Sequence, residues 1–380
     1  MSLFGDEITS PDLEADEGIN FDHANDAAGL QPAAQSTLCL GFDDLEREFL
    51  ELIAQQKVPH GVILSGPRGI GKATFAYRLA RALFKYPPPR DSAMNDMFGA
   101  PAPPAAPANL DVSSEDPIFR QVASGGHPDF RYLSAPEGKK ALDIDTIRTI
   151  GPFLSLQASE GGWRVVIIDD ANTMTNQAQN ALLKILEEPP PQTVLILIAH
   201  RDGAFLPTIR SRCRRYVCKA PRESEFEQIL KLSDPAMKQG DLDILYRLAE
   251  GSPGRALEFY EHELLEVVPT LGGLLSAYPN IDFEQVHLFA ERFARGHEEA
   301  LWQGFSETLL MMVRDAVFSK ARGAVMDGPL ALSAFTERLQ LEQLLVLCDK
   351  LEQHLREIDL RALDRRLGVI EAFMILDQSL

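Results

Sequence analysis

The sequence lacks the features of a secreted, membrane-bound or metal-stapled protein. Its 380 residues include only four cysteines, and no two of them have the C-x-x-C spacing of a zinc site. No apolar run approaches the roughly 18 residues of a membrane-spanning helix. The N-terminus has no basic segment followed by an apolar one, as a signal peptide would have. These absences predict a cytoplasmic protein with no membrane partner.

Positive charge is also scarce. The formal net charge is −19, and residues 1–46 hold eleven acidic residues and no lysine or arginine. A protein that binds nucleic acid strongly needs clustered Lys and Arg for the phosphates, so the isolated chain is not expected to do so. A subunit that shares such contacts stays possible. Residues 1–36 also lack periodic apolar positions, which predicts a disordered acidic tail rather than a docking peptide.

One hydroxyl is missing from the most informative motif. Residues 66–73 follow the Walker A pattern G-x-x-x-x-G-K-[ST], in which the final hydroxyl ligates magnesium. Gly66, Gly71 and Lys72 fit the pattern, but Ala73 stands where the hydroxyl is required. The loop is therefore built to hold a nucleotide triphosphate and lacks one group needed to hydrolyse it.

The surroundings of the motif support a phosphate-binding loop rather than an ordinary glycine-rich turn. An apolar strand is expected at Val62–Leu64 and a helix at Thr74–Lys85, the order that a P-loop requires. Backbone amides from Gly69 to Lys72 would then point at phosphate oxygens, with the N-terminus of the helix behind them. Lys72 would contact the β- and γ-phosphates.

A second candidate site follows a later strand. Val165–Ile168 is an apolar run that ends in Asp169 and Asp170. A carboxylate at the first of these positions holds magnesium in P-loop enzymes. The alternative is that both are surface acids at the start of the next helix.

A third candidate is an arginine in the turn Pro207–Cys213. Arg212 follows the fourth expected strand and could project from the domain edge toward a neighbour's nucleotide. A positive charge at a γ-phosphate accelerates hydrolysis by orders of magnitude. The alternative is an ordinary basic surface turn.

Alternating apolar strands and helical patterns between residues 37 and 219 predict an α/β domain with a parallel five-stranded sheet and helices on both faces. A Pro/Ala-rich insertion interrupts this domain at residues 87–117. After residue 219 the strands stop. Residues 220–265 predict a small helical domain and residues 266–380 a second helical domain with long amphipathic stretches. The expected strands are Val62–Leu64, Phe130–Leu133, Val165–Ile168, Val194–Ile198 and Arg215–Val217, and one helix is expected over Ile144–Phe153.

Several segments together resemble one known family, the bacterial clamp-loader AAA+ proteins. The resemblance covers about residues 38–258. Beyond them it rests on length and helical character. The segments that carry it are Gly66–Lys72, His127–Asp129, Asn180–Pro190, Leu206–Cys213 and, within the last, Ser211–Cys213.

The resemblance implies a RecA-like AAA+ domain, a helical lid and a helical collar that assembles into a five-subunit ring. Such a complex opens the sliding clamp and closes it on primer-template DNA, driven by ATP. Expected partners are therefore the motor subunits, the delta subunit, the clamp and that DNA. Arg212 would be the arginine finger for a neighbour's ATP, and Arg255 the lid's sensor arginine. The implied nucleotide-binding residues are Gly66, Gly69, Gly71, Lys72, Ala73, Thr74, Asp169, Asp170 and Arg255, with ATP and Mg as the candidate cofactors.

Departures from the family pattern favour a non-motor subunit. Motor subunits carry Thr or Ser after the loop lysine and Asp-Glu after the third strand, whereas this chain has Ala73 and Asp170. Residues 199–201 lack the Thr or Asn of sensor 1. Many relatives have a four-cysteine zinc module before His127, and this chain has none there, which predicts no zinc.

Three hypotheses follow from this pattern. In the leading one the chain has little or no ATPase of its own and completes a neighbour's site with Arg212. In the second it is a self-sufficient AAA+ ATPase of the motor type, with Thr74 shifted to serve magnesium. In the third it is an interaction scaffold that binds no nucleotide.

Overall fold

The computed structural model describes most of the chain. It covers residues 32–88, 107–135, 141–155, 158, 162–200, 203, 205–262, 264–294, 299–323 and 333–378. Residues 1–31 of the predicted acidic tail and residues 89–106 of the predicted insertion lie outside the described residues.

A parallel sheet of five strands forms the centre of the N-terminal part, as predicted. Its strand order is β2-β3-β4-β1-β5, and each neighbouring pair is parallel. Strands β1, β3 and β4 are buried at every position, which explains their uninterrupted apolar sequences. The edge strand β5 is partly exposed. The bounds are β1 (Gly61–Ser65), β2 (Phe130–Leu133), β3 (Arg164–Ile168), β4 (Thr193–Ala199) and β5 (Arg214–Val217).

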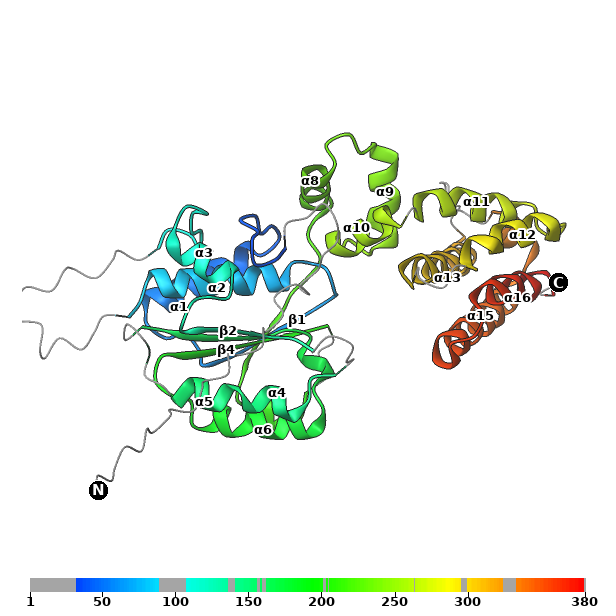
Figure 1. Cartoon of the computed structure of the whole chain (residues 1–380). Coiled ribbons are helices and arrows are strands. Elements are labelled where there is room, and N and C mark those ends of the chain that lie inside the picture. The colour runs from blue at the N-terminus through cyan, green and yellow to red at the C-terminus, as the bar shows by residue number, and fades with distance from the viewer. Residues whose placement is uncertain are drawn as a thin grey trace, which may run out of the picture.

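Helices cover both faces of this sheet (Figure 1). One face carries α1 (Asp43–Ala54), α2 (Lys72–Lys85) and α3 (Pro117–Ala123), and the other carries α4 (Ile144–Arg148), α5 (Ile150–Ser155) and α6 (Asn176–Glu187). Each face has its own hydrophobic cluster. The remaining short elements are η2 (Ala171–Thr173) and α7 (Pro207–Arg210).

The single helix predicted over residues 144–153 is wrong in one respect. The structure divides it into α4 and α5, with Thr149 between them. Pro152 explains the break, because proline has no amide hydrogen and its ring clashes with the carbonyl four residues earlier in a continuous helix. That carbonyl belongs to Arg148, where α4 ends.

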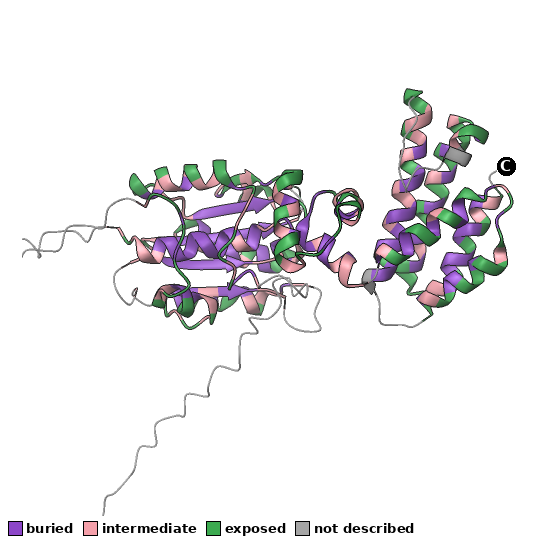
Figure 2. Cartoon of the chain, turned by 90° about the horizontal axis from the view of Figure 1, so that it is seen from above, coloured by how far each residue is buried: buried purple, intermediate pink, exposed green. Residues whose placement is uncertain are grey.

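The C-terminal part is helical, as predicted, and its apolar residues form one continuous cluster. The cluster runs from Phe226 to Leu376 and includes the fully buried Trp302 and Phe305. Figure 2 shows buried stretches along these helices. The helices are α8 (Glu223–Ser233), α9 (Gln239–Leu248), α10 (Pro253–Glu261), α11 (Leu264–Ser276), α12 (Phe283–Ala290), η3 (Glu291–Phe293), α13 (Glu299–Arg322), α14 (Ser333–Arg338), α15 (Leu341–Arg361) and α16 (Arg365–Asp377).

Two ion pairs join α9 and α10 to α13. Arg247 and Asp315 lie 2.7 Å apart, and Arg255 contacts Glu307. The predicted domain boundary between residues 265 and 266 therefore falls within a region where the helices pack together. The boundary stays a prediction. Among the described helices, none has the length and hydrophobicity needed to span a membrane.

Candidate functional site

The glycine loop lies between β1 and α2, at the carboxyl end of the sheet. Gly66 has φ +151°, and a Cβ atom there would lie 2.2 Å from the carbonyl oxygen of Cys218. Gly71 has φ +97° just before α2 begins. Larger residues would strain or displace this backbone, so the two glycines of the motif are explained by the path of the loop.

Lys72 is buried beneath this loop. Its Nζ donates hydrogen bonds to the carbonyl oxygens of Gly66, at 2.7 Å, and Pro67. Burial lowers the pKa of Lys72 to about 8, although nearby acidic groups, Asp169 among them, oppose the shift. The lysine is thus held at the loop, where its ammonium group can exchange a carbonyl for a phosphate oxygen.

Two cavities meet at the loop. The first, about 340 Å³, lies between residues 36–40, the loop and α8, and Leu38, Ile70 and Leu232 give it apolar walls. The second, about 180 Å³, is polar and is lined by Arg68, Lys72, Asp169, Asp170 and His200, among others. An apolar pocket beside a basic loop fits a nucleotide, with the base in the first cavity and the phosphates along the loop.

Asp169 lies at the end of β3, as predicted, but its carboxylate already has two donors from this chain. Oδ2 accepts a hydrogen bond of 2.9 Å from the hydroxyl of Tyr132, and Oδ1 accepts one of 2.8 Å from the amide of Asp170. Tyr132 lies on β2 and is only 1% exposed. Sequence reasoning missed this tyrosine, although its place on the strand beside β3 was predictable.

Asp170 and His200 face each other across the polar cavity. Asp170 has a left-handed backbone, φ 47°, and its Oδ1 lies 3.4 Å from His200 Nε2. The amide of His200 donates to Asn172 Oδ1 at 3.0 Å. Burial lowers the pKa of His200, with Lys72 acting in the same direction and Asp170 against it. His200, directly after β4, therefore lies at the polar cavity beside Asp170.

These residues do not fit a magnesium ion. Ala73 has no hydroxyl, and Thr74 lines the apolar cavity rather than the polar one. A cation at Asp169 Oδ2 would face the proton that Tyr132 donates. The loop therefore suits a nucleotide better than it suits the metal that accompanies nucleotides in P-loop enzymes.

The N-terminus of α10 packs directly on the loop. The Ser252 hydroxyl donates to the carbonyl of Arg68 at 2.6 Å, and the Gly254 amide donates to the carbonyl of Gly69 at 2.9 Å. A Cβ atom on Gly69 would lie 2.6 Å from Ser252 Oγ. Nothing in the sequence pattern of residues 251–254 indicated this contact, which joins residues almost two hundred positions apart.

Arg255 points its guanidinium at α13 in this structure. It pairs with Glu307 of α13 and lies over the ring of Phe259, 5.3 Å from its centroid. Burial lowers its pKa. Its backbone nitrogen lies close to Gly69, but the predicted sensor role of its side chain stays a prediction.

Arg212 lies at the opposite end of β1 from the glycine loop. Its carbonyl oxygen is close to Gly61, the first residue of β1, and Arg214 begins the parallel neighbour β5. A strand of five residues spans about 16 Å, so Arg212 does not belong to the chain's own nucleotide site. Its side chain is 35% exposed.

Two groups orient the Arg212 side chain. Nη2 lies 2.9 Å from Glu187 Oε1 at the end of α6, and Nη1 donates to the Thr208 carbonyl at 3.1 Å. The guanidinium has five N–H donors, so these contacts leave others for an acceptor outside the chain. Glu187 belongs to the segment that carried the family resemblance, but its contact with Arg212 was not predicted.

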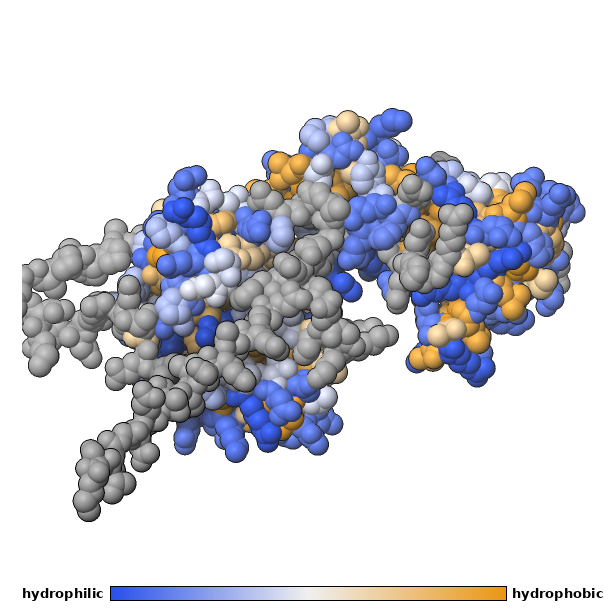
Figure 3. Space-filling view, viewed as in Figure 1, coloured by the Kyte–Doolittle hydropathy of each residue, from blue (hydrophilic) through white to orange (hydrophobic). Residues whose placement is uncertain are grey.

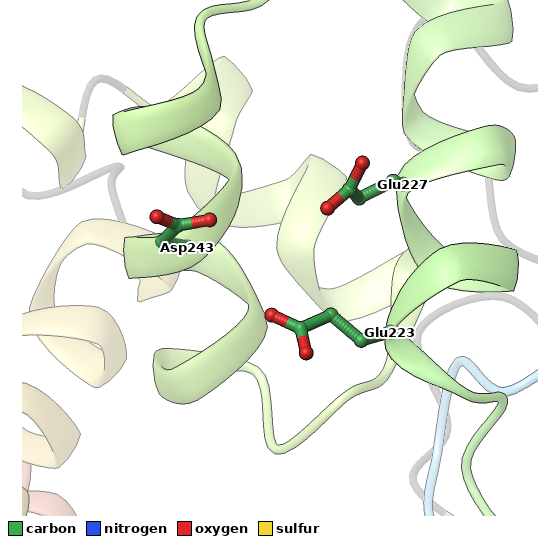
Figure 4. Close-up of side chains that lie close together, drawn as sticks. All are labelled: Glu223, Glu227 and Asp243. Atoms are coloured by element: carbon green, nitrogen blue, oxygen red, sulfur yellow. The ribbon is translucent and has the colours of Figure 1, made fainter.

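A cluster of carboxylates on α8 and α9 is stabilised by neighbouring side chains of the same chain. Glu223, Glu227 and Asp243 lie close together (Figure 4). Gln239 Nε2 donates to Glu227 at 2.7 Å and to Asp243 at 3.0 Å, and Lys231 pairs with Glu227 at 3.3 Å. Glu223 also lies in the first turn of α8, where negative charge is favourable.

Comparison with known proteins gives several matches. The family described as "DNA polymerase III, delta subunit" matches residues 111–221. DNA polymerase III subunit delta' of Pseudomonas aeruginosa is 34% identical over 194 residues, 51% of this chain and 53% of that protein. The subunit delta' of Escherichia coli K12 is 29% identical over 230 residues, 60% of this chain and 63% of that protein. The chain thus spans between half and two thirds of the length of these relatives.

A similar solved structure is a DNA polymerase III gamma subunit-related protein of Thermotoga maritima. It is 21% identical, the alignment covers 88% of this chain and 98% of that one, and the TM-score is 0.42. Over part of its length, the sequence of this chain is thus similar to that of DNA polymerase III subunit delta' proteins.

Proposed function

We propose that this chain is the non-motor, delta-prime subunit of a DNA polymerase III clamp loader. In this role it helps to load the sliding clamp onto primed DNA during replication and supplies an arginine finger to a neighbouring ATPase subunit. One observation carries the proposal. Arg212 is presented at the edge opposite the chain's own loop, while that loop lacks the groups that hold magnesium.

The chemistry needed from Arg212 is electrostatic. Charge develops on the γ-phosphate during ATP hydrolysis, and an arginine supplied from a neighbouring molecule can accelerate the reaction about 10³–10⁵-fold. Glu187 and Thr208 hold two nitrogens of the guanidinium. The side chain is therefore already ordered, and it loses less conformational entropy when it binds a phosphate. An exposed ion pair such as this one is worth about 0.2–1 kcal/mol, so a triphosphate can replace it.

The proposed partners are the motor subunits and the delta subunit in a ring of five, with the clamp and primer-template DNA reached through the complex. The helical part would provide ring contacts, with residues 220–265 as lid and residues 266–380 as collar. Figure 3 shows hydrophobic atoms among hydrophilic ones on the C-terminal helices. The exposed apolar side chains there include Leu345 and Val346 on α15 and Leu367 and Met374 on α16.

We propose that the loop retains a nucleotide site and little or no hydrolysis. The apolar cavity, the loop amides and Lys72 support binding of ATP. The rival proposal is a self-sufficient ATPase in which Thr74 takes the place of the missing hydroxyl. The position of Thr74 at the apolar cavity, away from Asp169, favours the first proposal.

The decisive experiment is ATP hydrolysis by the reconstituted complex with Arg212→Ala. We expect the ring to assemble normally and the clamp-stimulated ATPase to fall by about the share that one active site contributes, because the site beside this chain loses its positive charge. Arg47→Ala, which removes an exposed arginine of α1, is the matched control and should leave the rate unchanged.

Full activity of the complex with Arg212→Ala would refute the arginine-finger role. Steady-state turnover by the purified chain, at the rate of a motor subunit and abolished by Lys72→Ala, would instead establish the self-sufficient ATPase. If neither the wild type nor Lys72→Ala binds nucleotide, the scaffold hypothesis would be supported.

A further inference from the structure

The strongest departure from an ordinary P-loop site is the hydrogen bond between Tyr132 and Asp169. The hydroxyl lies 2.9 Å from Oδ2 of the carboxylate that would hold a metal. Tyr132 is buried, and its ring stacks on Tyr77 of α2 with the centroids 5.5 Å apart. The tyrosine therefore has little freedom to turn away when a ligand arrives.

The cost of breaking this bond adds to the cost of binding a metal. A magnesium ion on the side of Oδ2 that faces Tyr132 would meet the hydroxyl proton, so the phenol would have to rotate or lose its partner. A buried hydroxyl that loses its partner opposes binding of the metal on that side. The other oxygen of Asp169 accepts from the Asp170 amide at 2.8 Å, a contact fixed by the backbone.

The second usual ligand is absent as well. Ala73 offers only a methyl group at the start of α2. The groups around the polar cavity that carry or can carry positive charge are Lys72, Arg68 and His200, and they face Asp169 and Asp170. Phosphate oxygens there would be bound by N–H groups rather than by a shared cation.

We infer that this loop takes the phosphates of a nucleotide without a bound Mg²⁺ ion, because Tyr132 holds the carboxylate that would ligate the metal. The inference rests on the nucleotide site proposed above and is independent of Arg212. It makes Tyr132 a residue that selects against the metal, and it predicts that the metal site returns when the phenol oxygen is removed and a hydroxyl is added to the loop.

The test is calorimetric titration of the full chain with ATP, once in excess EDTA and once in excess MgCl₂. For the wild type we expect a weaker apparent Kd in excess MgCl₂ than in EDTA, because magnesium complexes ATP in solution and competes with a loop that binds it without the metal. For Tyr132→Phe combined with Ala73→Ser we expect magnesium to tighten binding by about tenfold, or about 1.4 kcal/mol. Mn²⁺ in place of Mg²⁺ gives a direct signal, because the electron paramagnetic resonance spectrum of the Mn²⁺–ATP complex should change on addition of protein only for the double variant.

Two controls separate the hydroxyl from general damage to the site. Tyr77→Phe removes a buried hydroxyl with no hydrogen-bond partner among the described residues, and it should behave as the wild type. Lys72→Ala should weaken ATP binding equally in both buffers. Thermal unfolding of each variant verifies that the fold is kept.

Wild-type binding that requires magnesium would overturn the inference. So would a wild-type chain that binds ATP in neither buffer. In that second case the arginine-finger proposal would still stand or fall on Arg212→Ala alone.

Discussion

Lys72 shows how a single residue can be kept in an unfavourable state by the loop around it. Its ammonium group is buried and bonded to two carbonyls, and burial lowers its pKa from 10.5 to about 8. The charged form is therefore less stable in the folded chain than in the unfolded one. A phosphate in the loop would supply the missing counter-charge.

This shift predicts a pH effect on stability. Between pH 8 and pH 10.5 the unfolded chain keeps a proton on Lys72 that the folded chain has lost. The contribution of this group to stability therefore rises with pH across that window. We expect the melting temperature of the wild type, measured relative to that of Lys72→Met, to increase as the pH rises from 8 to 10.5.

Differential scanning fluorimetry across that pH range provides the measurement. The comparison with Lys72→Met removes the effects of other titrating groups, which both proteins share. A constant difference between the two melting temperatures would contradict the lowered pKa.

At the scale of elements, the contact between the loop and α10 is the feature that joins the sheet domain to the helices. It depends on Gly69, where φ is +78° and a side chain would meet Ser252 and the backbone of Arg255. Two hydrogen bonds then fix α10 against the loop. These bonds use carbonyl groups of the loop and none of its amides, so the amides can bind a ligand.

Gly69→Ala should loosen this contact. A left-handed backbone at a residue other than glycine, together with the close approach, should cost on the order of 1–3 kcal/mol of unfolding free energy. Gly273→Ala in α11 is the matched control, because nothing lies within 4 Å of the added methyl. It should be neutral or stabilise by about 0.5–1 kcal/mol, as expected in a helix.

Urea unfolding of both variants measures these differences. Equal stability of Gly69→Ala and Gly273→Ala would show that α10 does not depend on the close approach at residue 69.

The elements themselves were largely predictable from the sequence. Strands β1, β3 and β4 lie where the apolar runs placed them, because a buried parallel strand has few alternatives to a short run of Val, Ile and Leu. Strands β2 and β5 also lie where they were predicted, although their sequences mix apolar residues with arginine. The break at Thr149 was missed, since a proline in the first turn of a second helix has no signature distinct from one within a loop.

The site was predicted only in part. Motif spacing identified the loop and Asp169, because those positions follow a strand along the chain. The partners of the site were not predictable in the same way. Tyr132 on β2 contacts Asp169, Ser252 before α10 contacts the loop, and Glu187 on α6 contacts Arg212 at the other end of β1. A contact between distant segments leaves no local pattern in a single sequence.

At the scale of the whole molecule, the helical part has one core from α8 to α16. Residues from both predicted helical domains contribute to it, and ion pairs from Arg247 and Arg255 cross the predicted boundary. A core shared in this way predicts that lid and collar unfold together.

Phe305→Ala tests this cooperativity. Phe305 is fully buried in α13 and packs against Phe289, Phe293 and Trp302. Its loss should cost about 3–5 kcal/mol. Hydrogen exchange followed by mass spectrometry should show faster exchange in α8–α10 and α11–α16 alike.

Phe318→Ala on the same helix is the control, since Phe318 is 56% exposed and its loss should change stability by less than about 0.5 kcal/mol. Faster exchange in α11–α16 with α8–α10 unchanged would show two independent units instead of one.

The placement of the glycine loop and Arg212 at opposite ends of β1 gives the chain a direction. In a head-to-tail row each member gives an arginine from one edge and receives one at the other. A subunit that offers an arginine to its neighbour, but whose own nucleotide site does not hydrolyse ATP, does not use an arginine from the other side. Such a subunit is suited to one end of the row. Such a chain would fix where the row stops, and the number of working ATP sites would then be set by the motor subunits alone.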